Sequence, residues 1–362
     1  MEIPPWIIPT AGAAALVWHV WKRKPSKEVP VHLVKTPSGS QVMLIDVRLG
    51  DGSYALFQVD TAFGGPPMLS KTYLAHAPPV YASGDVQRRY LQAANSKGGS
   101  ADGAGEDAVE RFLARCKNCR TFASGCSMQL MSIDAIQTHH SDLILAPALQ
   151  LQGKLPSSSS SLESDVLLTH SLPGSVHILT LDYMMHRSPV LIQPGKITFH
   201  ASLSWYDSFR MVEVSHVAGV FAIPIEVDGV GMKVMLDTGS STGLTLNRSA
   251  FGKLPRGVNH SSSSSSLHKH IVQRGVNGER TCNNLSLHRI LLAGYEVDAD
   301  PLPVMVKAVD GSVSEQVDGY MGLPFLRAFD LWMEHDRIGV RPSGRRAKGP
   351  PPLVLREGKC PT

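Results

Sequence analysis

This 362-residue sequence lacks several features that would assign it at once to a functional class. Its five cysteines are too few for a dense disulfide framework. Cys116 and Cys119 form one C-x-x-C pair with Cys126 nearby, but no second pair completes a tetrahedral zinc site. Free or locally paired thiols are therefore expected, and zinc with help from His139-His140 is the alternative. No cluster of basic residues alternates with aromatics, and the net charge is only +4, which argues against a nucleic-acid-binding protein.

The chain also has no basic residue before its first apolar run, Ile3–Trp21, so a cleaved signal peptide is poorly supported. The run carries no formal charge if His19 is neutral, and Lys22, Arg23 and Lys24 follow it. About 20 apolar residues suffice for a helix to cross a bilayer. We expect a single-pass membrane anchor at residues 1–27, with the body in the cytosol because basic residues favour that side. A buried N-terminal helix is the alternative.

One pattern occurs twice. Residues 42–62 read VMLIDVRLGDGSYALFQVDTA, and residues 221–239 read FAIPIEVDGVGMKVMLDTG. Each contains an alternating strand, a Gly/Asp turn, a second strand and then Asp-Thr-small, which is typical of a β-hairpin followed by a loop. Asp60 and Asp237 therefore occupy equivalent positions. The sequence predicts a mostly β chain built from a duplicated unit, with one such Asp in each copy.

The similarity between the copies continues downstream. Residues 128–147 align with residues 285–304 as strand pairs, and Asp165–Leu172 aligns with the apolar block Asp318–Phe325. We therefore predict four parts, namely an anchor (1–27), a divergent first repeat (28–200), a second repeat (201–342) and a basic, Pro-rich disordered tail (343–362).

Two related copies tend to pack about a pseudo-twofold axis, which would bring Asp60 and Asp237 together. Two carboxyl groups held close share one proton, because both cannot ionise cheaply. The ionised partner can then deprotonate a water, and the protonated partner can donate to a carbonyl oxygen. Such an acid–base pair is suited to amide hydrolysis without a metal, a cofactor or a covalent intermediate. Thr61 and Thr238 offer hydroxyls that can bond across the axis.

Two further residues of the second loop are expected to support the carboxyl groups. Gly239 lets the backbone N–H approach the carboxylate of its own loop closely, and Ser240 can donate to the outer oxygen of Asp237. Asp60 and Asp237 are thus the candidate catalytic residues, with Thr61, Thr238, Gly239 and Ser240 as supporting residues.

The motif Asp237-Thr-Gly-Ser-Ser241 resembles the active-site motif of aspartic proteases, and Asp318–Leu326 resembles the hydrophobic-hydrophobic-Gly block of their retropepsin-like members. The resemblance implies aspartic-protease-like β-barrel lobes around a central cleft. It also implies an aspartic endopeptidase that binds an extended peptide or protein substrate. In this family the block passes beneath the catalytic loop, which Gly322 would permit. Because one chain carries both halves, no dimer is required for the site.

The resemblance also implies a hairpin flap over the substrate. The candidate segments are Tyr81–Gly125 and Gly257–Thr281, with Tyr81 and Tyr90 as candidate flap aromatics; surface tyrosines are the alternative.

The first copy departs from the family pattern at three positions. Ala62 replaces the motif Gly, Phe63 replaces the Ser, and Thr169 replaces the Gly of the apolar block. These changes keep a second function open, that of a catalytically degenerate module that binds peptides while tethered to a membrane. A third possibility is a tether whose β body serves only as an interaction platform.

Overall fold

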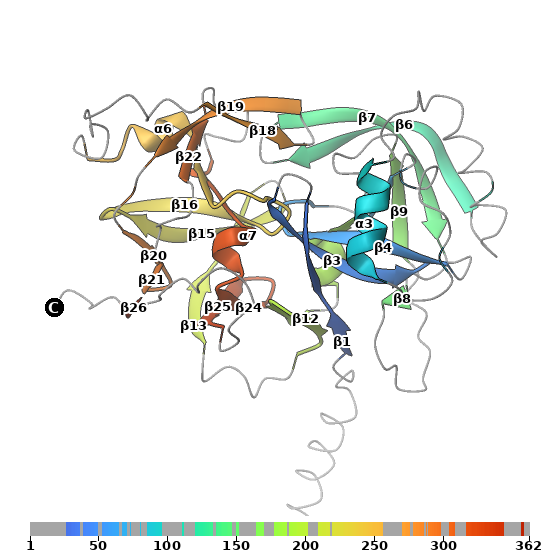
Figure 1. The fold of residues 1–362 in the computed structure, drawn as a ribbon, viewed down its shortest axis with the longest axis horizontal. Coiled ribbons are helices and arrows are strands. Elements are labelled where there is room, and N and C mark those ends of the chain that lie inside the picture. Colours follow the sequence, from blue (N-terminus) through green and yellow to red (C-terminus); the bar gives the residue numbers. More distant parts are fainter. Residues whose placement is uncertain are drawn as a thin grey trace, which may run out of the picture.

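The computed structural model of the chain is mostly β, as the sequence predicts. It describes residues 27–36, 39–49, 53–64, 67–70, 73, 80, 85–95, 111, 120–132, 135–146, 150–151, 164–169, 177–186, 188–201, 209–217, 219–255, 270–275, 278–285, 287, 289–297, 304–307, 316–343 and 356–357. Figure 1 shows two groups of curled sheets side by side, with the N-terminal half in blue and green and the C-terminal half in yellow and orange.

The first half forms a nine-stranded sheet. Its strands are β2 (His32–Lys35), β3 (Gln41–Arg48), β4 (Tyr54–Asp60), β5 (Met68–Ser70), β6 (Arg120–Ser132), β7 (Ala135–Ala146), β8 (Gln150–Leu151), β9 (Ser164–Thr169) and β10 (His177–Thr180). Helices α3 (Val86–Asn95) and α5 (Leu181–Met185) accompany it.

The second half forms an eleven-stranded sheet. Its strands are β14 (Ser215–Val217), β15 (Val220–Val227), β16 (Val230–Asp237), β17 (Leu244–Leu246), β18 (His270–Gly275), β19 (Gly278–Leu285), β20 (Ile290–Leu292), β21 (Tyr295–Val297), β22 (Val304–Lys307), β23 (Gly319–Gly322) and β26 (Arg356–Glu357). Its helices are α6 (Arg248–Phe251) and α7 (Leu323–Leu326).

The two sheets repeat one pairing scheme. β4 runs parallel to β10, which is antiparallel to β5, and β5 runs parallel to β9. In the second half β16 runs parallel to β23, β23 is antiparallel to β17, and β17 runs parallel to β22. Each scheme ends in a hairpin, β6–β7 in the first half and β18–β19 in the second. The chain thus builds the same topology twice, whereas the exact domain boundaries stay a prediction.

The strand pairing corrects the downstream sequence alignment. The parallel neighbour of β4 is β10, with Thr180 opposite Asp60, just as Gly322 of β23 lies opposite Asp237. Thr180 is therefore the counterpart of Gly322, and the assignment of Thr169 to that role is wrong. Thr169 ends β9, which pairs with β5 and β7 instead. The alignment of residues 128–147 with 285–304 is wrong for the same reason, because the counterpart of β6–β7 is β18–β19.

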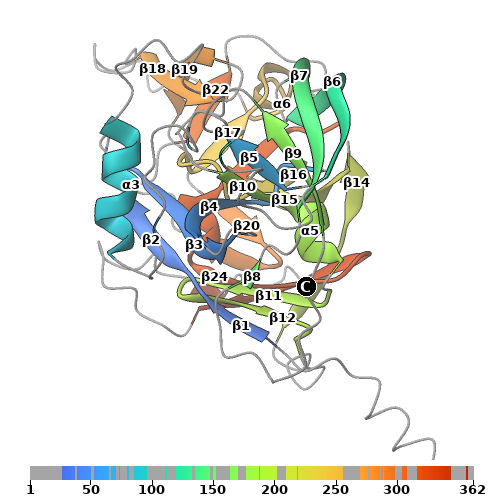
Figure 2. The same cartoon turned by 90° about the vertical axis from the view of Figure 1, so that its right-hand side faces the viewer.

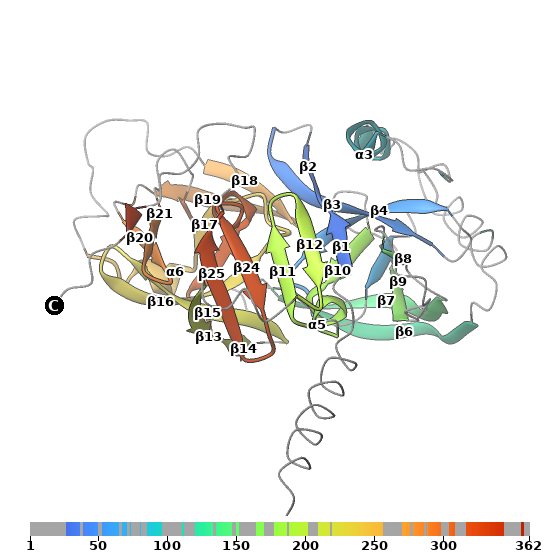
Figure 3. The same ribbon diagram turned by 90° about the horizontal axis from the view of Figure 1, so that it is seen from below.

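A six-stranded sheet joins the two halves, in the order β1 (Lys27–Pro30), β12 (Lys196–Phe199), β11 (Val190–Gln193), β24 (Phe329–Met333), β25 (Arg337–Pro342) and β13 (Arg210–Glu213). At its centre β11 of the first half is antiparallel to β24 of the second, and Figure 3 shows these strands lying side by side. Figure 2 shows this sheet on the side of the molecule opposite the β6–β7 and β18–β19 hairpins.

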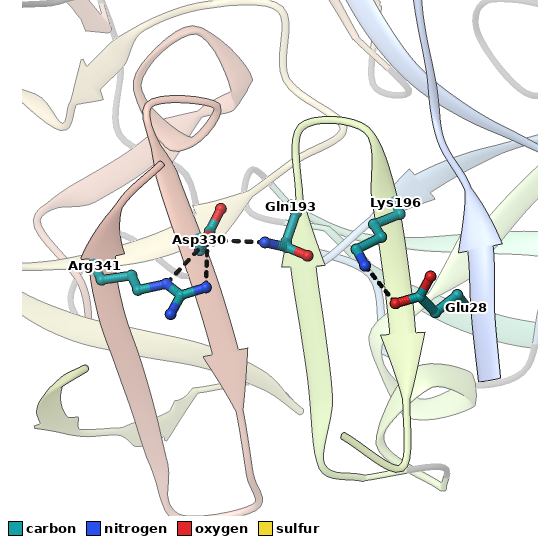
Figure 4. Close-up of polar contacts among 5 residues, drawn as sticks. All are labelled: Glu28, Gln193, Lys196, Asp330 and Arg341. Carbon is teal, nitrogen blue, oxygen red and sulfur yellow. Dashed lines mark hydrogen bonds and ion pairs between the residues drawn. The ribbon is translucent and has the colours of Figure 1, made fainter. Parts of the chain in front are cut away.

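Polar side chains reinforce this joining sheet (Figure 4). Gln193 Nε2 donates to Oδ2 of the buried Asp330 at 2.9 Å, and Arg341 donates to the same oxygen through Nε at 3.0 Å and Nη2 at 2.9 Å. At the sheet's edge Lys196 pairs with Glu28. Gln193 belongs to the first half and Asp330 to the second, so this hydrogen bond ties the halves together on the face away from the hairpins.

Helix α3 is anchored on the first half by a buried ion pair. Arg89 donates to both oxygens of Asp46, at 2.7 and 3.1 Å, and to the Tyr54 carbonyl at 3.1 Å. Gln87 of the same helix both accepts from the Lys35 N–H and donates to the Lys35 carbonyl. The helix therefore covers the edge of β2.

Residues 1–26 of the predicted membrane anchor lie outside the described residues, and Lys27 begins β1. Within the described residues no helix is long and apolar enough to span a bilayer. Cys116 and Cys119 also lie outside the described residues. The tail was expected to be disordered over residues 343–362, but Arg356–Glu357 forms β26, which pairs with β21.

Replacing Arg89 by Met should lower the free energy of unfolding by about 3 kcal/mol, because it takes the matching charge away from a fully buried carboxylate. A double Asp46→Leu/Arg89→Met variant should recover part of that loss. Urea unfolding of the single and double variants measures both values. A loss below about 1 kcal/mol in the single variant would show that this pair contributes no more than a surface ion pair.

Candidate active site

Asp60 and Asp237 end two equivalent strands, β4 and β16, at the interface of the two halves. Both residues are buried, with exposed fractions of 6% and 8%. The residues just before each aspartate are mostly buried and apolar, and each strand is flanked by a parallel neighbour from its own half. A charged residue at the end of such a strand is costly to bury unless it is hydrogen-bonded.

Reciprocal hydrogen bonds join the two loops that follow these residues. Thr61 N donates to Thr238 Oγ1 at 3.2 Å, and Thr238 N donates to Thr61 Oγ1 at 3.1 Å. Each hydroxyl also donates across the axis, Thr61 to the Leu236 carbonyl at 2.7 Å and Thr238 to the Val59 carbonyl at 2.8 Å. The cross-axis contact predicted for the two threonines is confirmed.

These four bonds determine where the aspartates lie. Each bonded group is either the threonine directly after an aspartate or the carbonyl directly before one, so both aspartates are fixed between bonded neighbours. All the atoms involved are buried, which makes the bonds costly to break. We call Asp60 and Asp237 the Asp pair below.

Gly239 lies directly against the Asp60 carboxyl group. A Cβ at this position would come within 2.1 Å of Asp60 Oδ2 and 2.4 Å of Cγ. No side chain fits there without a shift of the loop. Gly239 was expected to let the backbone approach the carboxyl group of its own loop, whereas the close approach is made to Asp60, the carboxyl group of the opposite copy.

Each carboxyl group of the Asp pair accepts a main-chain hydrogen bond. Ala62 N donates to Asp60 Oδ1 at 2.9 Å, and Ser240 N donates to Asp237 Oδ1 at 2.9 Å. The Ser240 hydroxyl was expected to serve Asp237, but it pairs with Thr242 Oγ1 at 2.7 Å instead. The expectation was wrong because the hydroxyls of Ser240 and Thr242, two residues apart in the same loop, satisfy each other.

Gly322 permits the close passage of the apolar block beneath the second loop. A Cβ on Gly322 would lie 1.9 Å from the Thr242 carbonyl oxygen, and Leu323 N donates to the Ser240 carbonyl at 2.9 Å. The first half keeps the equivalent main-chain bond, since Leu181 N donates to the Phe63 carbonyl at 2.9 Å. The replacement of Ser by Phe63 therefore preserves the backbone contact of this loop.

Burial raises the pKa of Asp60 from its usual 3.8 to about 6, and the hydrogen bond from Ala62 N–H opposes this shift. A carboxyl group in this range can hold a proton near neutral pH and can also release it. Within the described residues no group of three or more His, Cys, Asp or Glu comes together as a metal site.

One residue of the site was missed by the sequence analysis. Gln58 Nε2 donates to the Gly239 carbonyl at 2.8 Å, across the interface of the two halves. The available signal was a polar residue in an otherwise apolar strand, two positions before Asp60.

The two hairpins coincide only in part with the segments expected to hold flaps. β6–β7 begins at Arg120 and runs to Ala146, mostly beyond the segment Tyr81–Gly125, whereas β18–β19 begins within Gly257–Thr281 and ends at Leu285. Tyr81 lies outside the described residues, and Tyr90 is neither a flap aromatic nor a surface residue, because it is buried on α3.

Comparisons with known proteins give limited information. No family model matches the chain, and no curated protein matches it. Among the solved structures that match is a crystal structure of a retropepsin-like aspartic protease from Rickettsia conorii. The sequence identity is 20%, the match covers 36% of this chain and 86% of that chain, and the TM-score is 0.25. A TM-score of this size does not establish a shared fold.

The raised pKa of Asp60 predicts how stability depends on pH. Because the folded state holds the Asp60 proton more tightly than the unfolded state, its contribution to stability is present below about pH 4 and is lost as pH rises to about 6. The loss is about 3 kcal/mol, since one pKa unit is worth about 1.4 kcal/mol.

Urea unfolding between pH 4 and pH 7 measures this contribution. Asp60→Asn should remove this pH dependence of the free energy of unfolding. Asp336→Asn, at a carboxyl group with an exposed fraction of 83%, should keep it. Parallel pH curves for wild type and Asp60→Asn would refute the assignment.

Proposed function

We propose that the chain is an aspartic-type endopeptidase in which the Asp pair activates a water molecule. The observation that carries the proposal is the reciprocal hydrogen bonding of Thr61 and Thr238. It fixes two carboxyl-bearing loops, one from each half, against each other in a buried setting.

In this mechanism the ionised carboxyl group of the Asp pair takes a proton from water as the water oxygen forms a bond to the carbonyl carbon of the scissile peptide. The protonated partner donates its proton to the carbonyl oxygen. Collapse of the tetrahedral intermediate breaks the C–N bond as the leaving amine takes the proton that the first carboxyl group accepted from water. The hydroxyl formed from the carbonyl oxygen returns its proton to the second carboxyl group, which restores the pair. The pair thus serves as base and acid in turn, without a metal or an acyl-enzyme.

The substrate class proposed is a peptide or protein bound in an extended conformation. The β6–β7 and β18–β19 hairpins support this choice, because they lie on one side of the molecule, opposite the joining sheet. Extended peptides are commonly bound through main-chain hydrogen bonds to strand edges. The proposal includes the N-terminal anchor at residues 1–27 and a cytosolic body, for which the support is the sequence pattern alone.

A second candidate is a module that binds peptides without cleaving them. Ala62 and Phe63 favour it, because the first loop carries neither the Gly nor the Ser of the second loop. Their backbone contacts favour the enzyme, since Ala62 N–H still reaches the Asp60 carboxyl group and the Phe63 carbonyl still accepts from Leu181.

Asp60→Asn and Asp237→Asn should each lower the rate of peptide cleavage by about a thousandfold or more, because either change removes an acid–base group. Digestion of a peptide library by the full chain between pH 3 and pH 8, read by mass spectrometry, measures the rate. Asp336→Asn serves as the control, because it makes the same substitution at an exposed turn of the joining sheet and should keep full activity.

Two outcomes separate the candidates. Cleavage retained in both single variants would remove the Asp-pair mechanism. Peptide binding by a wild-type chain that cleaves nothing across the pH range would favour the binding module.

A further inference from the structure

Gln58 connects the first half to the carboxyl group of the second half. It lies on β4, two residues before Asp60, in a strand whose other central residues are buried apolar side chains. Its side chain is partly buried, and its Nε2 donates to the Gly239 carbonyl at 2.8 Å. Only the amide nitrogen of Gln58 can donate to a carbonyl oxygen, because the amide oxygen is an acceptor. The Gly239 carbonyl therefore determines which way the Gln58 amide points.

The acceptor belongs to a peptide group that also serves Asp237. The Gly239 carbonyl and the Ser240 N–H form one peptide unit, and Ser240 N donates to Asp237 Oδ1 at 2.9 Å. The chain of hydrogen bonds therefore runs from Gln58, through this peptide, to the Asp237 carboxyl group. A donor on the oxygen of a peptide group polarises the group and strengthens the bond that its N–H donates. A carboxylate gains more from such a bond than a carboxylic acid does.

The second copy has no equivalent of this connection. The residue two positions before Asp237 is Met235, which is buried and whose thioether cannot donate a hydrogen bond. The threonine hydrogen bonds are the same for both loops, whereas the Gln58 hydrogen bond is made to the second loop. Gln58 therefore makes the surroundings of the two carboxyl groups differ. Gly239 itself packs against the Asp60 carboxyl group.

The titratable groups at the ends of these strands are Asp60 on β4 and Asp237 on β16. The strands packed beside them, β10 and β23, present the neutral residues Thr180 and Gly322 at the same level. His177, three residues earlier on β10, is buried against Phe57 and Tyr73, and burial lowers its pKa to about 3, so it stays neutral over the working range.

We propose that Gln58 is a positioning residue that acts through the Gly239–Ser240 peptide to place the negative charge of the Asp pair on Asp237 and the shared proton on Asp60. Asp237 then deprotonates the water, and Asp60 donates to the substrate carbonyl oxygen. The raised pKa of Asp60 agrees with this division of roles. Where it concerns catalysis, the inference rests on the proposed endopeptidase function.

The test compares Gln58→Met with Gln193→Met in the full chain. The first variant copies the residue of the second half at the equivalent position. The second makes the same substitution at another glutamine whose amide bonds the opposite half, but in the joining sheet, where its acceptor is Asp330 (Figure 4). The main readout is kcat/KM for a cleaved peptide as a function of pH.

Gln58→Met should move the acid limb of that profile upward by about half a pH unit, because Asp237 gives up its proton less readily once the peptide is less polarised. The alkaline limb should stay in place, since it reports loss of the Asp60 proton with Asp237 already ionised. Gln193→Met should lower stability and leave both limbs unchanged. A merely structural role for Gln58 would lower kcat/KM at every pH without moving a limb.

Carbon-13 NMR of the aspartate carboxyl groups, assigned with Asp60→Asn and Asp237→Asn, gives a readout that needs no cleavage. It should show Asp237 titrating at lower pH than Asp60 in wild type, and the gap should narrow in Gln58→Met. If wild type cleaves no peptide, the endopeptidase proposal fails while this titration still decides the role of Gln58.

Three results would overturn the inference. They are an unchanged titration and acid limb in Gln58→Met, an equal shift in Gln193→Met, or a wild-type titration in which Asp60 ionises first. If Gln58→Met does not fold, Gln58→Leu removes the same donor and is judged by the same outcomes.

Discussion

The reciprocal hydrogen bonds between Thr61 and Thr238 are the contact on which the site depends. Each threonine bonds the other's main-chain N–H and the carbonyl that precedes the other's aspartate. The two loops therefore cannot move independently, and the position of each carboxyl group is set by the opposite half of the chain. This arrangement explains how two buried acidic residues are held at one interface despite the cost of bringing like charges together.

The remainder of the fold supports that contact from two directions. On the side away from the hairpins, β11 and β24 join the halves through an antiparallel pairing, and the Gln193–Asp330–Arg341 contacts add buried polar bonds to it. Directly beneath the loops, β10 and β23 run parallel to the strands that end in Asp60 and Asp237. The interface is thus fixed at the loops and again at the joining sheet, which limits rotation of one half against the other.

The two halves are alike in topology but not in detail. The first loop carries Ala62 and Phe63 where the second carries Gly239 and Ser240, and only the first half has a donor such as Gln58 two positions before its aspartate. A pair of carboxyl groups that shares a proton needs its two members to differ if one is to act as acid and the other as base. In a single chain with two diverged copies, each carboxyl group can have its own set of partners, which identical subunits cannot provide.

The sequence by itself determined the mostly β character, the equivalence of Asp60 and Asp237 and the pairing of Thr61 with Thr238. These follow from local patterns, since alternating strands and an Asp-Thr turn recur over short, matched stretches. The alignment of the two copies failed downstream, where long insertions separate β5 from β9. Two apolar strands of the first copy, β9 and β10, match the apolar block Asp318–Phe325 equally well. Only the tertiary pairing decided between them, by setting Thr180 rather than Thr169 beside Asp60. The partners of Ser240 and Gln58 were decided in the same way, because a side-chain hydrogen bond goes to whichever group the folded chain brings within reach.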